Sequence, residues 1–459
     1  MRLMTRDKAF YKSYFSLMCF IAFQNLLSFS VALLDNVMLS RYSSLALNGA
    51  ALANQIQFLL QMIVVAAGEG VVVLSAQYWG ARRTEPIRYI SSVGLMTGMV
   101  FGLVFLMTAT FLPKQVLGLL SDDAQIVDAA ADYLRIIRFT YPVYCLTTVL
   151  LATQRSVENA SIGFAVMLSS LLVNLFLNYT LIYGHFGFRE MGIRGAALAT
   201  LAARCFELAV TLIYTFMIDQ KLRLRLPQLF SRDKVLTRDY YKYATPIMLG
   251  GASWGIAMFI QTSIIGHMGG DVISANSLAL SVFNVISVFA YGGGNAAGVL
   301  TGKLVGSGNR DRIREYVYTM QCLFVLTGIV TGSLIFAARI PIIRLYRLET
   351  EEAVGYAKQF LLVLSVTAIG TSYQAPCLTG IVRGGGLTKF VFYNDLIFQW
   401  GVVLLFSLLA AYVWHFPPVW IFFILKSDQL LKCAVAAVEV NRFTWIRNLT
   451  SGGKAEKAL

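Results

Sequence analysis

Stretches of about 20 apolar residues, separated by short polar breaks, recur along the whole chain. A run of that length can cross the hydrocarbon core of a bilayer as a helix, and only helices or closed barrels satisfy their backbone hydrogen bonds there. Hydrophobic residues make up 57% of the sequence and charged residues 14%, which is far from the composition of a soluble domain. The sequence therefore predicts an all-α polytopic membrane protein.

The positions of the apolar runs predict twelve membrane helices. We expect them at approximately residues 14–39, 45–76, 89–112, 126–153, 161–184, 193–218, 240–266, 272–302, 316–338, 352–380, 388–413 and 418–440. The first run has no small-residue cleavage site after it, so we interpret it as a helix and not as a signal peptide. The longest polar interruption separates the sixth helix from the seventh. We expect an N-terminal lobe over residues 1–218, a cytoplasmic linker over 219–242, a C-terminal lobe over 243–440 and a cytoplasmic tail over 441–459.

Residues 35–88 resemble the stretch that lies 226 residues further along the chain. At this offset Gly68 aligns with Gly294 and Gly80 with Gly306. Two copies of a helical unit predict two six-helix lobes related by a pseudo-two-fold axis, with a cavity between the lobes. Such an arrangement is typical of transporters that expose a central site to each side of the membrane in turn.

Lysine and arginine concentrate in every second loop, above all in residues 219–242 and in residues 303–314. The positive-inside rule then places both termini in the cytoplasm of a cell whose plasma or inner membrane holds the protein. The formal net charge of +14 is dispersed over these short loops. It therefore does not form the single basic face that a nucleic-acid-binding protein needs.

Two acids interrupt the first pair of apolar helices. Asp35 is expected roughly 9 Å inside the outer membrane boundary and Glu69 roughly 16 Å from the cytoplasmic end, near the midplane. An ionisable group in hydrocarbon costs at least ~2.5–3.5 kcal/mol, so each needs a proton, a cation or a polar partner. In the second copy Gln261 replaces the first acid and Asn295 the second. Coupling-ion, proton or substrate binding is one interpretation of these positions, and structural hydrogen bonding is the other.

Polar residues in two other helices are further candidates. Asn174 and Asn178 are four residues apart and therefore share one helix face. Their amides could bind a cation or hydrogen-bond Asp35, or they could simply connect neighbouring helices. Asp395 is the only acid of the eleventh helix. It could serve the second lobe, or it could lie at the membrane interface.

The remaining charged and metal-binding residue types suggest no catalytic site. Arg155 with Glu158, and Arg204 with Glu207, are each three residues apart and are expected to form local ion pairs. The three histidines and six cysteines are scattered singly. We therefore expect no metal, no cofactor and no enzymatic activity.

Three segments resemble one transporter family. They are LLDNVMLSRYSSLALNGAALANQI at 33–56, NYTLIYGHFGFREMGIRGAALATLAAR at 178–204 and GIVRGGGLTKF at 380–390. Together they resemble segments of the MATE (multidrug and toxic-compound extrusion) transporters of bacterial type, over essentially the whole chain. The resemblance implies a twelve-helix antiporter of two lobes. It would expel amphipathic, often cationic, organic molecules in exchange for H⁺ or Na⁺.

The resemblance also implies roles for single residues. Asp35 matches an acid linked to coupling-ion binding, Asn174 matches the asparagine beside it, and Ala196 falls where a sixth-helix residue completes the site. Asn178 stands where many members have aspartate, which weakens the case for sodium. Trp254 stands where one subfamily has glutamate, so a second-lobe ion site of that type is in doubt and this residue is expected in the cavity wall.

We therefore predict a secondary active antiporter that acts as a monomer on small organic molecules within the lipid bilayer. A flippase of lipid-linked saccharides from the same superfamily is the alternative, and it would have a more cationic cavity. A membrane receptor that does not transport also stays open. A channel would need a selectivity filter, and the sequence shows no candidate for one.

Overall fold

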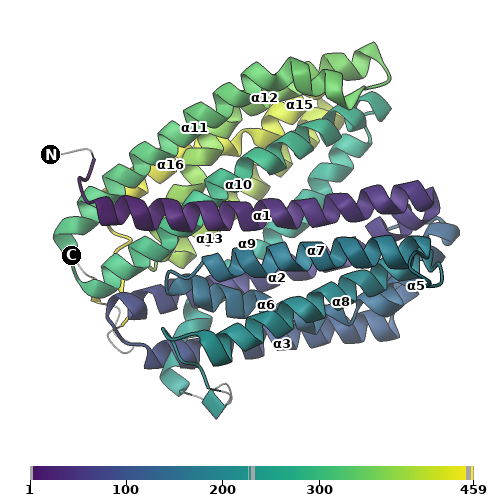
Figure 1. Ribbon diagram of the computed structural model, residues 1–459. Helices are drawn as coiled ribbons and strands as arrows, with labels where there is room; N and C mark the ends of the chain where they lie inside the picture. Colours follow the sequence, from purple (N-terminus) through teal and green to yellow (C-terminus); the bar gives the residue numbers. More distant parts are fainter. Residues whose placement is uncertain (1–3, 226, 229–232, 451–455, 458–459) are drawn as a thin grey trace. The chain divides into compact units, whose positions relative to one another are not determined.

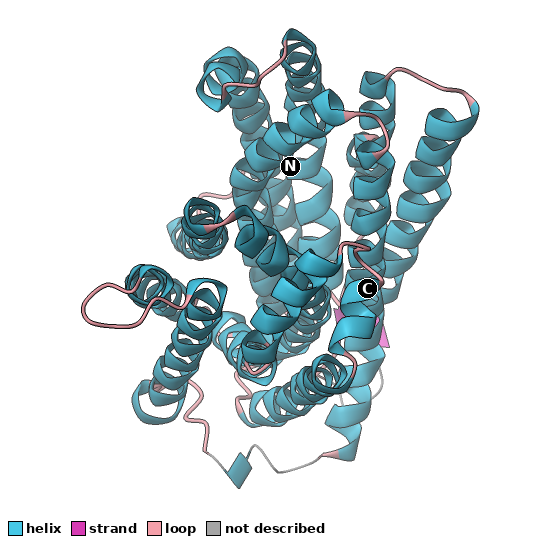
Figure 2. Ribbon diagram, turned by 90° about the vertical axis from the view of Figure 1, so that its right-hand side faces the viewer, coloured by secondary structure: helices cyan, strands magenta, loops and turns pink. Residues whose placement is uncertain are grey.

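The computed structural model describes residues 4–225, 227–228, 233–450 and 456–457, and nearly all of them are helical (Figures 1 and 2). Among these described residues, ten helices are long and apolar enough to cross a membrane, or eleven if one bent pair counts as a span. The prediction of an all-α polytopic membrane protein is therefore confirmed. The long helices are α1 (Lys8–Tyr42), α2 (Ser44–Gly80), α3 (Glu85–Phe111), α7 (Ser161–Tyr183), α8 (Gly192–Ile213) continued by η1 (Tyr214–Ile218), α9 (Lys234–Gly266), α10 (Gly270–Ser307), α11 (Arg310–Tyr346), α12 (Glu351–Ala375) continued by η3 (Pro376–Val382), and α13 (Thr388–Leu396) continued by η4 (Ile397–Leu404), α14 (Leu405–Leu408) and η5 (Leu409–Val413).

Two of the twelve predicted spans are broken. The span expected at 126–153 consists of α5 (Ala124–Ile137) and α6 (Thr140–Ser156), which bend by 55° against each other. Pro142 lies in the first turn of α6, where its missing N–H leaves no helical hydrogen bond unmade. The span expected at 418–440 consists of α15 (Pro418–Lys426) and α16 (Asp428–Arg442). At 9 and 15 residues, neither α15 nor α16 is long enough to cross a bilayer alone.

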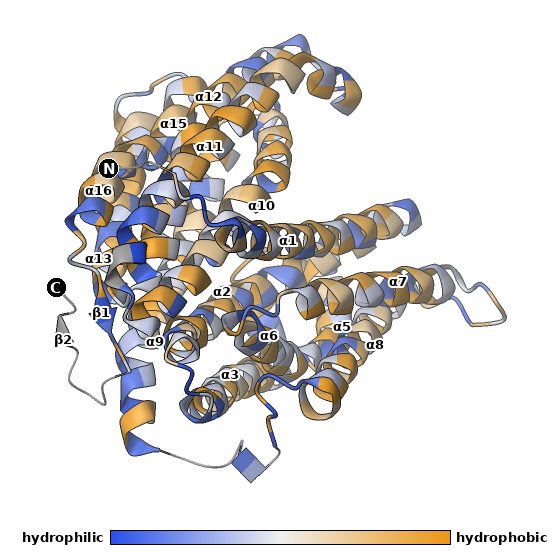
Figure 3. Ribbon diagram, turned by 60° about the vertical axis from the view of Figure 1, so that its left-hand side comes forward, coloured by the Kyte–Doolittle hydropathy of each residue, from blue (hydrophilic) through white to orange (hydrophobic). Residues whose placement is uncertain are grey.

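The remaining elements are short. They are α4 (Pro113–Gly118) and an antiparallel pair of two-residue strands, β1 (Arg447–Asn448) and β2 (Glu456–Lys457). Hydrophobic colour dominates the shafts of the long helices, whereas the connecting loops are largely hydrophilic (Figure 3). Large apolar side chains such as Leu33, Leu172 and Leu334 are about 60% exposed. Apolar exposure on this scale is expected where lipid, and not water, surrounds the helices.

The chain divides into two compact units, which we describe separately. Unit 1 comprises Met1–Ala22, Ala76–Arg82 and Leu249–Leu459, and unit 2 comprises Phe23–Ser75 and Arg83–Met248. Helices α1, α2 and α9 each contribute one part to unit 1 and another part to unit 2. The candidate residues on α1, α7 and α8 belong to unit 2.

Unit 2 is built around a core in which Leu60, Leu134 and Tyr141 are completely buried. The core joins α1, α2, α5, α6 and α8. Helices α3 and α6 approach closely where Gly102 faces the backbone of Pro142, since a Cβ atom there would lie 2.9 Å from the Pro142 Cα. This packing holds the helices that carry the polar side chains of the unit.

Unit 1 is built around an apolar cluster in which the rings of Phe360 and Phe422 stack with centroids 4.1 Å apart. The segment just before α1 packs in this unit, since the Thr5 backbone N–H donates to the Thr319 hydroxyl at 2.9 Å, and the first part of α1 belongs to the same unit. The described part of the expected tail is packed as well. Trp445 is completely buried, and the Leu449 N–H donates to the Gln77 side chain at 2.9 Å.

Within unit 1 the end of α2 meets the end of α10 backbone to backbone. A Cβ atom at Gly80 would overlap the carbonyl oxygen of Lys303, and a Cβ atom at Gly306 would overlap the carbonyl oxygen of Gln77. Lys303 follows Gln77 by the repeat offset of 226 residues, as Gly306 follows Gly80. The contact is therefore reciprocal, as expected of two elements related by a two-fold axis. Only glycine allows this approach at both positions.

Candidate functional site

Asp35 lies about two turns before Tyr42, the last residue of α1, and directly after the apolar residues Leu33 and Leu34. Its carboxylate oxygen Oδ1 accepts a hydrogen bond of 2.5 Å from Nδ2 of Asn178 on α7. The same nitrogen donates to Oδ1 of Asn174 at 3.0 Å. Asn174 and Asn178 are 2% and 0% exposed, whereas Asp35 is half-buried. The fold thus brings together the acid and both amides that the sequence singled out.

Two polar atoms of this cluster have no hydrogen-bond partner among the described residues. They are Oδ1 of Asn178 and Nδ2 of Asn174. A buried acceptor or donor without a partner typically costs about 1–3 kcal/mol. The cluster can also accommodate a proton on Asp35, because the Asp35 O–H could donate to Oδ1 of Asn178 after rotation of that amide, which would turn Nδ2 away from Asn174. The site can therefore exchange a charged, deprotonated state for a neutral, protonated one.

Electrostatic neighbours of Asp35 come from two more helices. Tyr133 on α5 and Arg204 on α8 both interact with its charge. The Arg204 guanidinium forms a 2.7 Å ion pair with Glu207 and lies 5.2 Å from the ring centroid of Tyr144. The expected local pair on this helix is therefore confirmed. Because Glu207 is 3% exposed, its carboxylate balances the Arg204 guanidinium inside the unit and holds it in a fixed position.

Sequence reasoning missed Tyr133 and Arg204 as neighbours of Asp35. For Arg204 a signal was available, because it follows Ala196 by eight residues and so lies two turns along the same helix face. Ala196 is 2% exposed and belongs to the same apolar core as Leu39 and Tyr133. Its side chain has no polar atom, so it can only shape the wall of the site.

Glu69 is engaged in an ion pair. Oε1 of Glu69 lies 2.6 Å from a guanidinium nitrogen of Arg155 on α6, and the two side chains are 17% and 19% exposed. Arg155 thus reaches across to α2, a contact that its three-residue spacing from Glu158 does not predict. Gly68 makes this approach possible, since a Cβ atom there would lie 3.0 Å from the Cβ of Ala152. The partner that Glu69 needs in the membrane is thus supplied by the protein.

Replacing Arg155 by methionine is expected to lower the free energy of unfolding by about 2–3 kcal/mol, because Glu69 is then left buried without a cation. The effect is smaller than the ~3–5 kcal/mol of a fully buried pair, since both side chains keep some exposure. Thermal unfolding of the purified protein measures it, and Glu69→Gln combined with Arg155→Met should recover most of the loss. As a control, Arg135→Met removes an exposed pair and should change stability by less than about 1 kcal/mol. Equal losses in both variants would contradict a special role for the Glu69 pair.

The other predicted site residues lie in unit 1. Asp395 pairs with Lys432 of α16, with Oδ1 and Nζ 3.0 Å apart. The Asn295 amide donates to the Tyr291 carbonyl oxygen of its own helix at 3.0 Å. Gln261 is 9% exposed and Trp254 41% exposed, both on α9. Asp395 is thus the member of this group with a charged partner. Across the described ranges, no three histidine, cysteine, aspartate or glutamate residues are grouped as a metal site requires.

A family model described as MatE matches residues 21–180 and again residues 246–398. The chain belongs to the MatE family. MatE proteins are transporters and not enzymes, and the resemblance noted in the sequence is confirmed. The two matches begin at residues 21 and 246, close to the spacing of the internal repeat.

Relatives of this MatE protein carry names that concern drug resistance. One, from Thermotoga maritima, is called "Probable multidrug resistance protein NorM" and is 27% identical over 327 residues, covering 70% of this chain and 69% of the relative. Another, from Bacillus subtilis, is called "Probable multidrug resistance protein YoeA" and is 22% identical over 351 residues, covering 75% of this chain and 74% of the relative.

Solved structures confirm the MATE fold. A structure of the Vibrio cholerae MATE transporter VcmN matches with a TM-score of 0.85 at 15% identity, over 95% of this chain and 97% of that chain. A MOP superfamily transporter from Pyrococcus furiosus matches with a TM-score of 0.83 at 18% identity, over 94% of this chain and 96% of that chain. At such identities the likeness concerns the fold alone.

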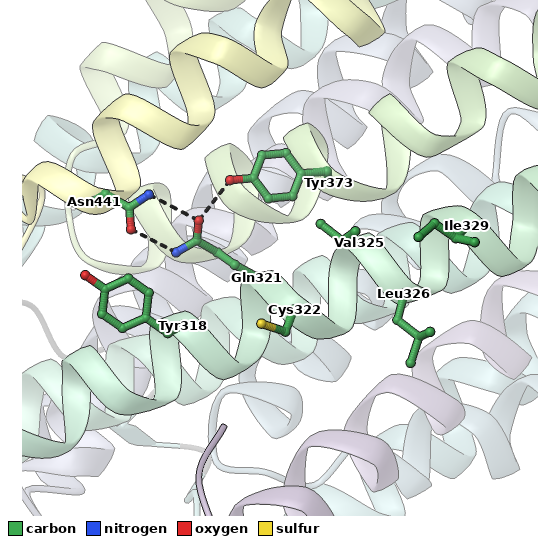
Figure 4. A pocket seen from close by; sticks show the side chains of 8 residues that line it. All are labelled: Tyr318, Gln321, Cys322, Val325, Leu326, Ile329, Tyr373 and Asn441. Carbon is green, nitrogen blue, oxygen red and sulfur yellow. Dashed lines mark hydrogen bonds between the residues drawn. The ribbon is translucent and has the colours of Figure 1, made fainter. Parts of the chain in front are cut away.

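The MatE chain also has an open pocket of about 510 Å³ in unit 1 (Figure 4). Apolar side chains of α11, including Val325 and Ile329, form one wall. At the other end Gln321 accepts a 2.8 Å hydrogen bond from the Tyr373 hydroxyl and donates one of 3.2 Å to Asn441. These polar groups satisfy one another, so the pocket does not require a ligand to complete its hydrogen bonds.

Proposed function

We propose that this MatE protein is a secondary active antiporter that exports amphipathic organic cations in exchange for protons, with Asp35 as the proton-binding carboxylate. The observation that supports it most is the cluster of Asp35, Asn174 and Asn178, in which a half-buried acid on a membrane helix accepts a hydrogen bond from the Asn178 amide, and that amide in turn donates to Asn174. An acid in that setting is a functional candidate by default. The names of the relatives support a drug-like substrate.

The arrangement favours a proton over sodium as the coupling ion. Sodium binds several oxygen atoms, as other hard cations do, and the Asn178 amide would have to rotate before its oxygen could join Asp35 in holding such an ion. Asp35 is also the one carboxylate among the three residues of the cluster. Two other acids of this unit's helices, Glu69 and Glu207, are each paired with an arginine and are not available as further ligands. A proton needs one carboxylate oxygen and no further oxygen ligands.

Transport then follows from competition between proton and substrate. We propose two lobes, divided at the linker near residues 219–242, that expose the substrate to each side in turn from a plasma or inner membrane with both termini in the cytoplasm. A ligand drives such a change only through its difference in affinity for the two states. Protonation of Asp35 therefore has to favour the state that releases the substrate outside.

Efflux of the fluorescent cation rhodamine 6G from proteoliposomes tests this function. An inward proton gradient is expected to drive efflux, and a sodium gradient at constant pH is expected to leave the rate near that of protein-free liposomes. Efflux driven by the sodium gradient alone would show that sodium, and not the proton, is the coupling ion. Absence of efflux under both gradients would overturn export of organic cations and favour another substrate, beginning with lipid-linked saccharides.

A further inference from the structure

Unit 1 contains a second cluster of charges within its membrane helices. Lys432 on α16 is 6% exposed, and its Nζ lies 3.0 Å from Oδ1 of Asp395 and 3.2 Å from Oδ2 of Asp428. Asp428 is one turn earlier on α16, and Asp395 is the penultimate residue of α13. Two carboxylates thus share one ammonium group. Among these three hydrogen-bonded groups the formal charge is −1.

The two carboxylates differ in how firmly the protein holds them. Asp428 is 6% exposed, and both of its oxygens accept hydrogen bonds from Nε2 of Gln429, at 3.0 and 3.1 Å. Gln429 is itself fixed, because its Oε1 accepts a 2.8 Å hydrogen bond from Gln374 of α12. Asp395 is 37% exposed, and Lys432 is its one hydrogen-bond partner among the described residues. Asp395 is therefore the accessible acid of the pair.

Other polar groups face the cluster from neighbouring elements. Lys426 on α15 interacts electrostatically with Asp428, and its Nζ lies 5.1 Å from the Phe283 ring centroid. Tyr291 on α10 interacts with all three charged groups. Gln399, one turn after Asp395 and on the same helix face, is 6% exposed, and its Nε2 is without a hydrogen-bond partner within the described ranges. The segment η4 that carries it is π-helical, and such segments are frequent at functional sites.

We propose that Asp395 binds the positively charged group of an exported organic cation, and that Lys432 is a built-in competitor that leaves Asp395 and turns fully to Asp428 when the ligand binds. The inference rests on the proposed function, because it concerns where the substrate of that exporter binds. The exchange requires little motion, since Nζ of Lys432 is already within 3.2 Å of both carboxylates. After the exchange each carboxylate has one cation, and no buried acid is left without a partner.

The competition predicts that removing Lys432 and removing either aspartate change the affinity for an organic cation in opposite directions. Removal of the ammonium group in Lys432→Gln should raise the affinity for an organic cation. Asp428→Asn should lower it, because the ammonium group then has no second carboxylate to accept it. Asp395→Asn should lower it as well. A purely structural cluster would weaken binding in all three variants. The direction in which Lys432→Gln changes the affinity therefore distinguishes competition from a structural role.

Binding of rhodamine 6G to the purified full-length protein in lipid nanodiscs, followed by fluorescence anisotropy at constant pH, measures these affinities. We expect a gain of about tenfold for Lys432→Gln and losses of about tenfold for Asp428→Asn and Asp395→Asn, each equivalent to ~1.4 kcal/mol. Lys389→Gln is the matched control. It removes an exposed lysine near the start of α13 and should leave the affinity within about twofold.

Unchanged or weaker binding by folded Lys432→Gln would overturn the competition. If this variant does not fold, Lys432→Gln combined with Asp428→Asn keeps the charge of the cluster, and it should also bind more tightly than the wild type. Equal binding by wild type and Asp395→Asn would overturn the site while leaving the proposed function intact. Absence of binding by the wild type would instead count against organic cations as substrates, and against this site with them.

Discussion

Replacement of Asp35 by asparagine is expected to reduce proton-driven efflux of rhodamine 6G to the rate of protein-free liposomes. Asparagine keeps the size of the side chain and can still accept a hydrogen bond from Asn178, so the helix contact should survive. It cannot bind or release a proton, so the two states of the transporter would no longer differ in proton affinity. We expect a loss of at least about tenfold, since each ~1.4 kcal/mol of lost coupling changes the ratio of states tenfold.

Efflux under an imposed pH gradient, measured at equal amounts of reconstituted protein, tests this prediction. Ser30→Ala is the matched control, because Ser30 lies on the same helix and, within the described part of the chain, its hydroxyl donates to the Leu26 carbonyl oxygen alone. Its efflux rate should stay within about twofold of the wild type. Asp35→Asn should nevertheless bind rhodamine 6G, which separates loss of coupling from loss of the substrate site. Undiminished proton-driven efflux by Asp35→Asn would show that another group carries the proton.

The helices and the first cluster could be anticipated because both depend on local pattern. Apolar runs of sufficient length indicate membrane helices without any knowledge of packing. Asn174 and Asn178 share a face through their spacing alone, and an acid inside an apolar helix requires a partner. A hydrogen bond from one of these amides to Asp35 was one interpretation of the residues themselves, and the fold brings Asn178 and Asp35 together.

The charge pairs between distant helices could not be anticipated from local pattern. Arg155 has Glu158 three residues away, and spacing alone favours that pair. The fold instead places α2 beside α6, where Arg155 meets Glu69. Lys432 escaped notice for the same reason, because its partner Asp395 is 37 residues earlier in the sequence and on another helix. Such choices depend on helix packing, which one sequence without relatives does not determine.

Alanine at position 80 is expected to cause one of the largest losses of stability for a change of a single methyl group in this protein. The Cβ atom would overlap the carbonyl oxygen of Lys303 on α10. A backbone carbonyl cannot turn aside as a flexible side chain can, so the ends of α2 and α10 must separate. Overpacking of this kind typically costs about 1–3 kcal/mol and sometimes more. Thermal unfolding of the purified protein in detergent measures the loss.

Because the contact between α2 and α10 is reciprocal, the prediction extends to Gly306 and to the double variant. Gly306→Ala should destabilise the protein to a similar extent, because its Cβ atom would overlap the carbonyl oxygen of Gln77 at the same helix crossing. The first added methyl group already forces the two helices apart, and this leaves room for the second. The double variant should therefore lose clearly less stability than the sum of the two single variants. Gly401→Ala is the control, since a Cβ atom there meets nothing within 4 Å, and alanine is favoured over glycine in a helix by up to about 1 kcal/mol. Strict additivity of the Gly80 and Gly306 variants would mean that the two glycines do not share one contact, and that the two-fold relation of α2 and α10 does not extend to their packing.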